Sequence, residues 1–477
     1  MPVTFPVSSP SAQGVDARGI LAFLDAVAAE PTSELHSIAV VRRGYLVAEG
    51  YWAPYQADDL PLVYSVSKTF TATAVGLAVA EGLFGLDDRL VDLIPEDVPA
   101  DVDRRVREIT VHHLLSMSTG RDVDALPLML ESPATEWART YLSQVPAEPV
   151  GSRHIYDNGA SWMCGELVRR SSGQSLVEFL RPRLLEPLGL TEFTWDTDSL
   201  GRELGWSGAH VPTRGLAAMG ELYRCDGVWQ GRRLLPEGWV ARLGVQHIPT
   251  AHEVNPEWCL GYGYQVWMGR EGYRLDGAYG QFSFVLADRE SVVAITSAQS
   301  FTQRLIDLLW EHLVPALGSG GDEAADAALA ERLLALRIPA PEDSGLGYWW
   351  EADGPLVIDP SIAPHVEEQL NLPAVYGVVI FRHPEGGFRV SLGYSDTRPT
   401  VDIDGSGWER SLMELLGHDV PVAVAAGADA DGQVEARILF LDTPHTLVLK
   451  LDHRGWGRIA WSVPPLQSNR LEALRAR

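Results

Sequence analysis

The segment over residues 67–81 is the strongest constraint on the fold, because it is rich in Ala, Val, Leu and Thr and has almost no polar face. Its length and composition predict a helix, and Gly82, which follows it, suits a helix C-cap. A helix that is apolar on all sides is a buried one. We therefore expect this helix to lie inside a substantial domain, with other elements packed around it.

Strand-like segments lie on both sides of a long helical stretch. An amphipathic helix at 17–29 precedes a predicted hairpin, and strand character returns late, before another helix at 303–314. The residues between, about 83–243, resemble short helices and loops. This order predicts an α+β domain in which an antiparallel sheet, flanked by terminal helices, carries a helical subdomain. The predicted strands are 36–42, 45–51, 261–268, 281–286 and 291–297.

The chain is long enough for more than one domain. It has 477 residues, of which 46% are hydrophobic. We expect a first domain over 1–317, a linker with a short helix over 318–336, and a β-rich domain over 337–477. The linker begins with the Gly-rich, acidic run GSGGDEAAD. Alternating segments predict an antiparallel barrel or sandwich in the last domain. These segments are 375–381, 388–392, 434–441, 447–451 and 459–463.

Charge and composition exclude several kinds of partner. Lys and Arg total 38 against 64 Asp and Glu, for a net charge of −26, so nucleic acid would be repelled. The N-terminus has no basic head followed by an apolar run, and no stretch approaches the ~20 apolar residues that cross a bilayer. Three cysteines lack metal-ligand spacing. We expect a cytoplasmic protein with no metal, no cofactor and no membrane partner; the sequence leaves its oligomeric state open.

Lysine is almost absent from the chain. It occurs only at Lys68 and Lys450, so 36 of the 38 basic residues are arginine. A group that must release its proton near neutral pH can be lysine but not arginine. Ser65 lies three residues before Lys68, and residues three apart share a helix face. An apolar setting lowers a lysine pKa, and a neutral amine can accept the serine proton. The pair predicts a nucleophile with its base, whereas Lys450 is expected to be solvated.

A second pattern, Tyr156-Asp157-Asn158, enters a predicted helix. A phenol beside an ammonium group can be partly ionised and can relay a proton to a leaving group. The amide can orient both the lysine and a substrate. In isolation the pattern also fits a turn with an Asx cap and a buried tyrosine.

A third pattern, Asp276-Gly277-Ala278-Tyr279, leads into the predicted strand at 281–286. Small residues at a strand edge let a substrate carbonyl approach the backbone. Backbone N–H groups there can form an oxyanion hole together with that of Ser65. A plain hairpin turn is the alternative, just as chance spacing is the alternative for Ser65 and Lys68.

The three patterns, in this order and spacing, resemble the serine β-lactamase and penicillin-binding-protein superfamily. The likeness is greatest to the branch of class C β-lactamases, esterases and D-aminopeptidases, and it extends over about residues 15–315. Connecting segments support it as landmarks of that family. They are EGLFGLDD (81–88), ITVHHLLSMSTG (109–120), PLGL (187–190) and GVWQGRRLLPEGWV (227–240).

The resemblance implies a β-lactamase/transpeptidase-like domain with the site in a cleft between the sheet and the helical subdomain. It implies that Ser65 is the acylated nucleophile and Lys68 the general base. Tyr156 would exchange protons with Lys68 and the leaving group, and Asn158 would hold Lys68 and the substrate amide. Tyr279 would supply an oxyanion N–H.

The third pattern departs from the family. The family has Lys or His where this chain has Asp276, followed by Thr, Ser or Gly where it has Gly277, and then by Gly where it has Ala278. The usual cation helps to bind a substrate carboxylate. An acid in its place disfavours β-lactamase and carboxypeptidase activity and favours a neutral or amine-bearing acyl substrate.

Three functions are therefore compatible with the sequence. The leading hypothesis is a serine hydrolase that forms an acyl-enzyme and cleaves a small ester, amide or peptide. The second is an acyltransferase or peptide cyclase that passes the acyl group to an amine or alcohol. The third is a ligand-binding protein without catalysis on the same fold.

Overall fold

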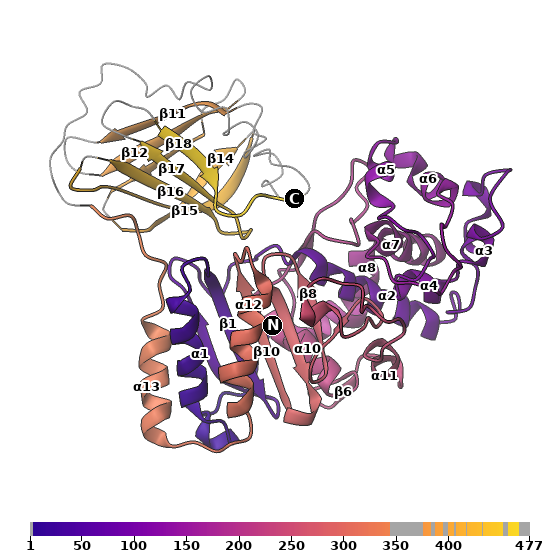
Figure 1. Cartoon of the computed structure of the whole chain (residues 1–477), viewed down its shortest axis with the longest axis horizontal. Helices are drawn as coiled ribbons and strands as arrows, with labels where there is room; N and C mark the ends of the chain where they lie inside the picture. The colour runs from indigo at the N-terminus through magenta and orange to yellow at the C-terminus, as the bar shows by residue number, and fades with distance from the viewer. Residues whose placement is uncertain are drawn as a thin grey trace.

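The computed structural model of the chain describes residues 3–343, 375–382, 387–394, 399–404, 407–415, 417–431, 433–451 and 457–466. A six-stranded antiparallel sheet of order β2-β1-β10-β9-β8-β7 forms the centre of its larger part (Figure 1). Val40 of β1 lies opposite Val293 of β10, so the strands on either side of the helical stretch join in one sheet, which confirms the expected α+β fold. The strands are β1 (Leu35–Arg42), β2 (Tyr45–Tyr51), β7 (Trp267–Met268), β8 (Tyr273–Gly277), β9 (Gln281–Leu286) and β10 (Ser291–Ser297).

Helices cover both faces of this sheet, because its strands are buried on both sides. Val40 faces a core shared with the terminal helices, whereas its neighbour Val41 faces the core of the helical subdomain. Figure 1 shows the terminal helices together on one side of the sheet. They are α1 (Ala17–Ala29), α12 (Thr302–Leu308), which continues as a π-helical turn to Leu313, and α13 (Glu323–Leu334). On the other face, α10 (Thr213–Arg224) packs against β1, β9 and β10.

The segment expected as a linker and short helix, 318–336, packs against the first part of the chain. Asp322 caps the N-terminus of α13 by accepting from Ala325 N, and Asp326 on this helix accepts from the backbone N–H of Ser11. The helix contacts α1 and β2. The domain boundaries themselves, 1–317, 318–336 and 337–477, stay a prediction.

The apolar helix of the sequence is α2 (Ser67–Ala80), and it is buried from Ser67 to Ala78. It packs against α7 (Asn158–Ser172). A Cβ at Gly76 would lie 2.2 Å from the Trp239 ring, so this glycine lets an indole rest directly on the helix backbone. The rest of the subdomain comprises short elements: α3 (Leu90–Leu93), α4 (Val111–Leu115), α5 (Leu126–Leu130), α6 (Trp137–Ser143), α8 (Leu176–Leu180), α9 (Glu186–Leu188), α11 (Trp239–Leu243), and the two-residue strands β3 (Thr194–Trp195), β4 (Ala209–His210), β5 (Val228–Trp229) and β6 (Arg232–Arg233).

The described residues of the C-terminal region form two antiparallel sheets, of order β11-β12-β13 and β14-β15-β16-β17-β18. Residues from both sheets, such as Val390 and Ile438, share one core, as expected for a sandwich. Within the described ranges, no helix combines the length and apolarity needed to cross a membrane. The strands are β11 (Val375–Arg382), β12 (Phe388–Tyr394), β13 (Thr400–Ile403), β14 (Glu409–Leu415), β15 (His418–Ala428), β16 (Val434–Phe440), β17 (Thr446–Leu451) and β18 (Gly457–Trp461).

One predicted strand, 261–268, is wrong over most of its length, since only β7 at its end is a strand. Gly261 and Gln265 both have positive φ, 110° and 59°, which bends the backbone away from a ladder. The Gln265 side chain also donates to the carbonyl oxygens of Leu114 and Leu115, and this ties the segment to α4. Of the aromatic residues here, Tyr264 packs in the core of the helical subdomain, whereas Trp267 also lines the cleft described below.

Candidate active site

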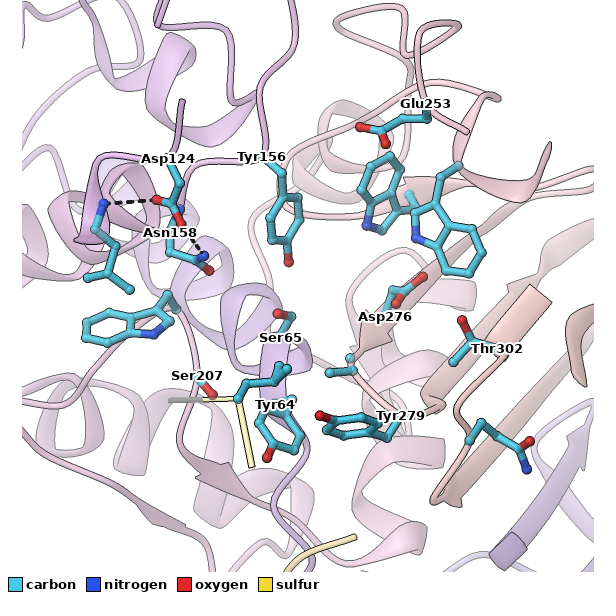
Figure 2. A pocket seen from close by; sticks show the side chains of 18 of the residues that line it. Tyr64, Ser65, Asp124, Tyr156, Asn158, Ser207, Glu253, Asp276, Tyr279 and Thr302 are labelled. Carbon is cyan, nitrogen blue, oxygen red and sulfur yellow. Dashed lines mark hydrogen bonds between the residues drawn. The ribbon is translucent and has the colours of Figure 1, made fainter. Parts of the chain in front are cut away.

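A cleft of about 650 Å³ opens between the helical subdomain, the end of β8 and the C-terminal region. Ser65 lies in it, between side chains of the subdomain and of the sheet edge (Figure 2). The lining includes all the residues expected at the site except Lys68, which lies behind Ser65. Those residues are Ser65, Tyr156, Asn158, Asp276, Gly277, Ala278 and Tyr279.

Ser65 occupies a short 3-10 turn, Tyr64–Val66, that runs directly into α2. Lys68 is on the first turn of α2, and its Nζ lies 2.9 Å from Ser65 Oγ and 2.8 Å from the Trp206 carbonyl oxygen. Tyr64 has φ of 47°, a left-handed conformation that is uncommon for a non-glycine residue. Its carbonyl accepts from Ser67 Oγ at 2.6 Å, which holds the turn in place. Ser65, the predicted nucleophile, is thus held on a constrained turn.

Burial controls the charge of Lys68. The residue is 1% exposed, and desolvation lowers its pKa from 10.5 to about 7, although Asp124, Asp276 and Asp157 oppose this shift. A substantial fraction of the amine is therefore uncharged at neutral pH. In that form it has a lone pair that can accept a proton from Ser65.

Tyr156 places its ring 4.7 Å from Lys68 Nζ, and its hydroxyl points toward Ser65 in Figure 2. Burial raises the pKa of Tyr156 above its ordinary value, and this outweighs the lowering by its hydrogen bond with Ser65. The sequence-based expectation of a partly ionised phenol is therefore wrong in direction, because the site is too dry. With its pKa raised, the Tyr156 phenol keeps its proton at neutral pH.

Asn158 contacts a different partner from the one expected. Its Nδ2 donates to Asp124 Oδ2 at 2.6 Å, and its backbone N–H donates to Asp124 Oδ1 at 2.9 Å (Figure 2). The hydrogen bonds described for Lys68 go to Ser65 and Trp206 instead. Sequence reasoning missed Asp124, because a carboxylate 34 residues before Asn158 belongs to no recognisable spacing. It fixes the amide at the cleft wall.

Asp276 at the end of β8 has a buried counter-ion. Arg274, on the same strand face, is 0% exposed and donates from Nε to Asp276 Oδ2 at 2.8 Å. Burial raises the pKa of Asp276, while Arg274 opposes the shift. The next residue, Gly277, is required by space, since a Cβ there would lie 2.2 Å from the Val63 carbonyl oxygen. The i, i+2 spacing of the strand was the signal that could have identified Arg274.

The cleft is acidic. Carboxylates of Asp124, Glu253 and Asp276 line it, and no arginine, lysine or histidine is among its described lining residues. Asp124 accepts only from neutral amide groups in the hydrogen bonds described for it. Asp276 is paired with Arg274, which lies outside the lining, so the carboxylates of Asp124 and Glu253 are the lining charges that no described lining cation offsets.

The C-terminal region completes one wall. Leu466 lines the cleft, and the Tyr279 hydroxyl donates to the Pro464 carbonyl oxygen. The Tyr64 hydroxyl forms a 2.6 Å hydrogen bond with Nε2 of His445. Tyr64, just before Ser65, and Tyr279, just after β8, are thus both held by the C-terminal region.

The comparisons with known proteins agree on a family. The sequence model described as Beta-lactamase matches residues 33–313, more than half of the chain. Penicillin-binding protein 4 of Amycolatopsis lactamdurans is 29% identical over 328 residues, which cover 59% of this chain and 82% of that protein. Lovastatin esterase of Penicillium rubens is 28% identical over 166 residues, 29% of this chain and 40% of the esterase. The aligned part thus spans about two fifths of that esterase.

A solved structure resembles most of the molecule. The octameric penicillin-binding protein homologue from Pyrococcus abyssi is 16% identical, with a TM-score of 0.51, and the match covers 88% of this chain and 97% of that one. At this identity the likeness concerns the fold. The matched family model establishes that the chain belongs to the beta-lactamase family, within the serine β-lactamase and penicillin-binding-protein superfamily.

Proposed function

We propose that the protein is a serine hydrolase that forms an acyl-enzyme at Ser65 and cleaves an ester or amide bond. The observation that carries the proposal is the 2.9 Å contact between Ser65 Oγ and the buried Nζ of Lys68. A serine hydroxyl is a weak nucleophile until an adjacent base takes its proton. A lysine with a pKa near 7 is suited to that task at neutral pH.

In the proposed reaction, neutral Lys68 accepts the proton of Ser65 as Oγ attacks the substrate carbonyl carbon. The backbone N–H groups of Ser65 and Tyr279 stabilise the oxyanion. Tyr156 gives its proton to the leaving alcohol or amine and regains one from Lys68, so that the bond to the leaving group breaks and an acyl-Ser65 ester remains. Water then attacks this ester by the reverse proton route and releases the acid.

The charge of the cleft supports a substrate that carries an amino group near the scissile bond. Asp124, Glu253 and Asp276 line the cleft, where a substrate ammonium would find an opposite charge and a carboxylate would be repelled. The family usually has a cationic side chain at the position of Asp276, so the charge at this position is opposite here.

Labelling with a fluorophosphonate tests the nucleophile and its base. Ser65→Ala and Lys68→Arg should both abolish labelling and nitrophenyl ester turnover, because arginine keeps the charge but cannot act as a base. Lys450→Arg is a matched control, since Lys450 is the other lysine, and its exposed side chain pairs with Glu435. Full labelling of Lys68→Arg would overturn the proposal.

Matched nitrophenyl esters test the substrate class. An amine-bearing ester should be turned over with higher kcat/KM than a neutral ester of the same size, and a carboxylate-bearing one with the lowest. Asp276→Asn should reduce the preference for the amine about fivefold or more, which corresponds to at least ~1 kcal/mol for one ion pair. An unchanged preference would refute the role of Asp276.

Acyl transfer to an amine or alcohol is the second candidate. Its support is a relative, the ML-236A carboxylate methylbutanoyltransferase of Penicillium citrinum, 28% identical over 163 residues. Product partition with and without an added amine or alcohol separates the two reactions. If Ser65 takes no label at all under any condition, ligand binding without catalysis becomes the better description.

A further inference from the structure

A second cluster of reactive side chains lies on the cleft wall beside Tyr156. His154 belongs to the segment that leads into Tyr156, whereas His252 and Glu253 belong to the loop between α11 and the 3-10 turn Pro256–Trp258. One donor atom from each of the three residues lies within 4.8 Å of the other two. The proposed acyl transfer uses none of the three as an acid, base or nucleophile.

His154 is the unusual member of the cluster. Its side chain is 0% exposed, and neither ring nitrogen has a hydrogen-bond partner in the described part of the chain. The ring packs against Tyr262 and Trp267, with centroid distances of 4.8 and 5.4 Å. Burying a polar group without a partner costs free energy, so an orphan of this kind calls for an explanation. A ligand that takes the lone pair of one nitrogen would provide it.

The three donor atoms surround a point that a metal ion can occupy. Glu253 Oε1 lies 3.7 Å from His154 Nδ1 and 3.8 Å from the His252 Nε2 atom. Ligands about 2.0–2.2 Å from a tetrahedral ion are about 3.3–3.6 Å apart, so small side-chain rotations would close the site. We propose that His154, His252 and Glu253 bind one divalent transition-metal ion of the Zn²⁺ class.

The donor set decides the class of ion. Two imidazoles and one carboxylate match zinc and its neighbours, whereas Ca²⁺ and Mg²⁺ require mainly oxygen ligands. Three protein ligands leave a fourth position for water. The loop that carries two of the ligands is already fixed, because Glu253 N donates to the Thr250 carbonyl at 2.9 Å and Cys259 Sγ donates to the Glu253 carbonyl at 3.0 Å.

The ion would act on the cleft through Glu253. This carboxylate lines the cleft, and coordination would compensate its negative charge. Coordination would also tie the segment of His154, two residues before Tyr156, to the loop of His252. This consequence rests on the proposed function, whereas metal binding itself does not.

Equilibrium dialysis of the chelator-treated full chain against Zn²⁺ tests the site. The wild type should bind one ion per chain. His252→Ala should bind it about 100-fold more weakly or worse, since even losing an outer partner of a ligand costs 10–100-fold. His252 is partly exposed, so its removal spares the core. Glu253→Gln keeps the shape of the side chain and should also weaken binding, and Zn²⁺ should raise the unfolding temperature of the wild type but not that of His252→Ala.

His247→Ala is the matched control. His247 belongs to another histidine cluster, where it stacks on Tyr264 and donates from Nε2 to the Arg242 carbonyl. Its substitution should leave Zn²⁺ binding unchanged. The proposal is overturned if the wild type binds no more Zn²⁺ than His252→Ala, if His247→Ala abolishes binding, or if Ca²⁺ and Mg²⁺ bind as tightly as Zn²⁺. Fluorophosphonate labelling of Ser65 in the same samples reports separately on the proposed hydrolase.

Discussion

Replacing Lys68 by methionine should make the folded protein more stable at pH 7 while it abolishes acylation. Methionine has a similar length and no charge. The lysine sits where burial lowers its pKa from 10.5 to about 7, which corresponds to about 5 kcal/mol of differential free energy between the charged and the neutral amine. At pH 7 most of this free energy destabilises the wild type. The Lys68 amine is fully protonated in the unfolded chain, whereas the folded site disfavours its charged form.

The net gain should be smaller than that figure. Lys68 donates to Ser65 and to the Trp206 carbonyl, and losing two hydrogen bonds costs about 2 kcal/mol in total. We therefore expect Lys68→Met to raise the free energy of unfolding by about 2–3 kcal/mol at pH 7. Residues that catalysis requires often destabilise the fold that holds them.

The stability difference between Lys68→Met and the wild type should change with pH in one direction. The folded pKa is depressed, so between about pH 7 and 10.5 the unfolded chain binds more protons than the folded chain, and wild-type stability rises with pH across this window. The advantage of Lys68→Met should therefore shrink by about 1.4 kcal/mol per pH unit above pH 7 and stay constant below it.

Urea titrations of both proteins from pH 6 to pH 9.5 measure this difference without any substrate. Lys450→Met is the control, because it removes the exposed lysine that pairs with Glu435 and should change stability by no more than about 1 kcal/mol. The stability advantage of Lys68→Met should fall by about 3.5 kcal/mol between pH 7 and pH 9.5 and change sign on the way, and an advantage that stays constant would refute the reasoning.

Three further predictions concern the site. The kcat/KM for ester hydrolysis should rise about tenfold per pH unit up to about pH 7 and then level off, because Lys68 must be neutral to act as a base; a flat profile down to pH 5 would contradict this. Gly277→Ala should lower the rate of fluorophosphonate labelling at least about tenfold in a folded protein, since its Cβ meets the Val63 carbonyl oxygen. Asp124→Ala should release the Asn158 side chain and reduce stability by about 1–3 kcal/mol, as urea titration would show.

Local chemistry explains what the sequence could predict. The contact between Ser65 and Lys68 could be predicted because the two residues are three apart at the start of a helix. The burial of α2 could be predicted from its apolar composition alone. The strand β15 was not predicted, because Pro421 and a run of Ala and Gly lower its β-propensity; its pairing with β14 and β16 compensates.

Long-range partners explain what the sequence could not predict. The hydrogen bonds between Asp124 and Asn158 and the grouping of His154 with His252 depend on how loops far apart in the chain meet. Arg274 could have been predicted as a partner of Asp276, because residues two apart on a strand lie on the same face. The expectation of a partly ionised Tyr156 failed because the sequence does not reveal how dry the site is.

The hydrogen bond between Tyr64 and His445 joins residues 381 positions apart, next to the nucleophile. During synthesis, all the proposed catalytic residues therefore leave the ribosome long before His445, whose hydrogen bond with Tyr64 supports the turn of Ser65. A chain truncated before residue 445 would contain the proposed catalytic residues but would lack the His445 contact with Tyr64. The support that His445 gives to the turn of Ser65 therefore forms only after residue 445 has been synthesised.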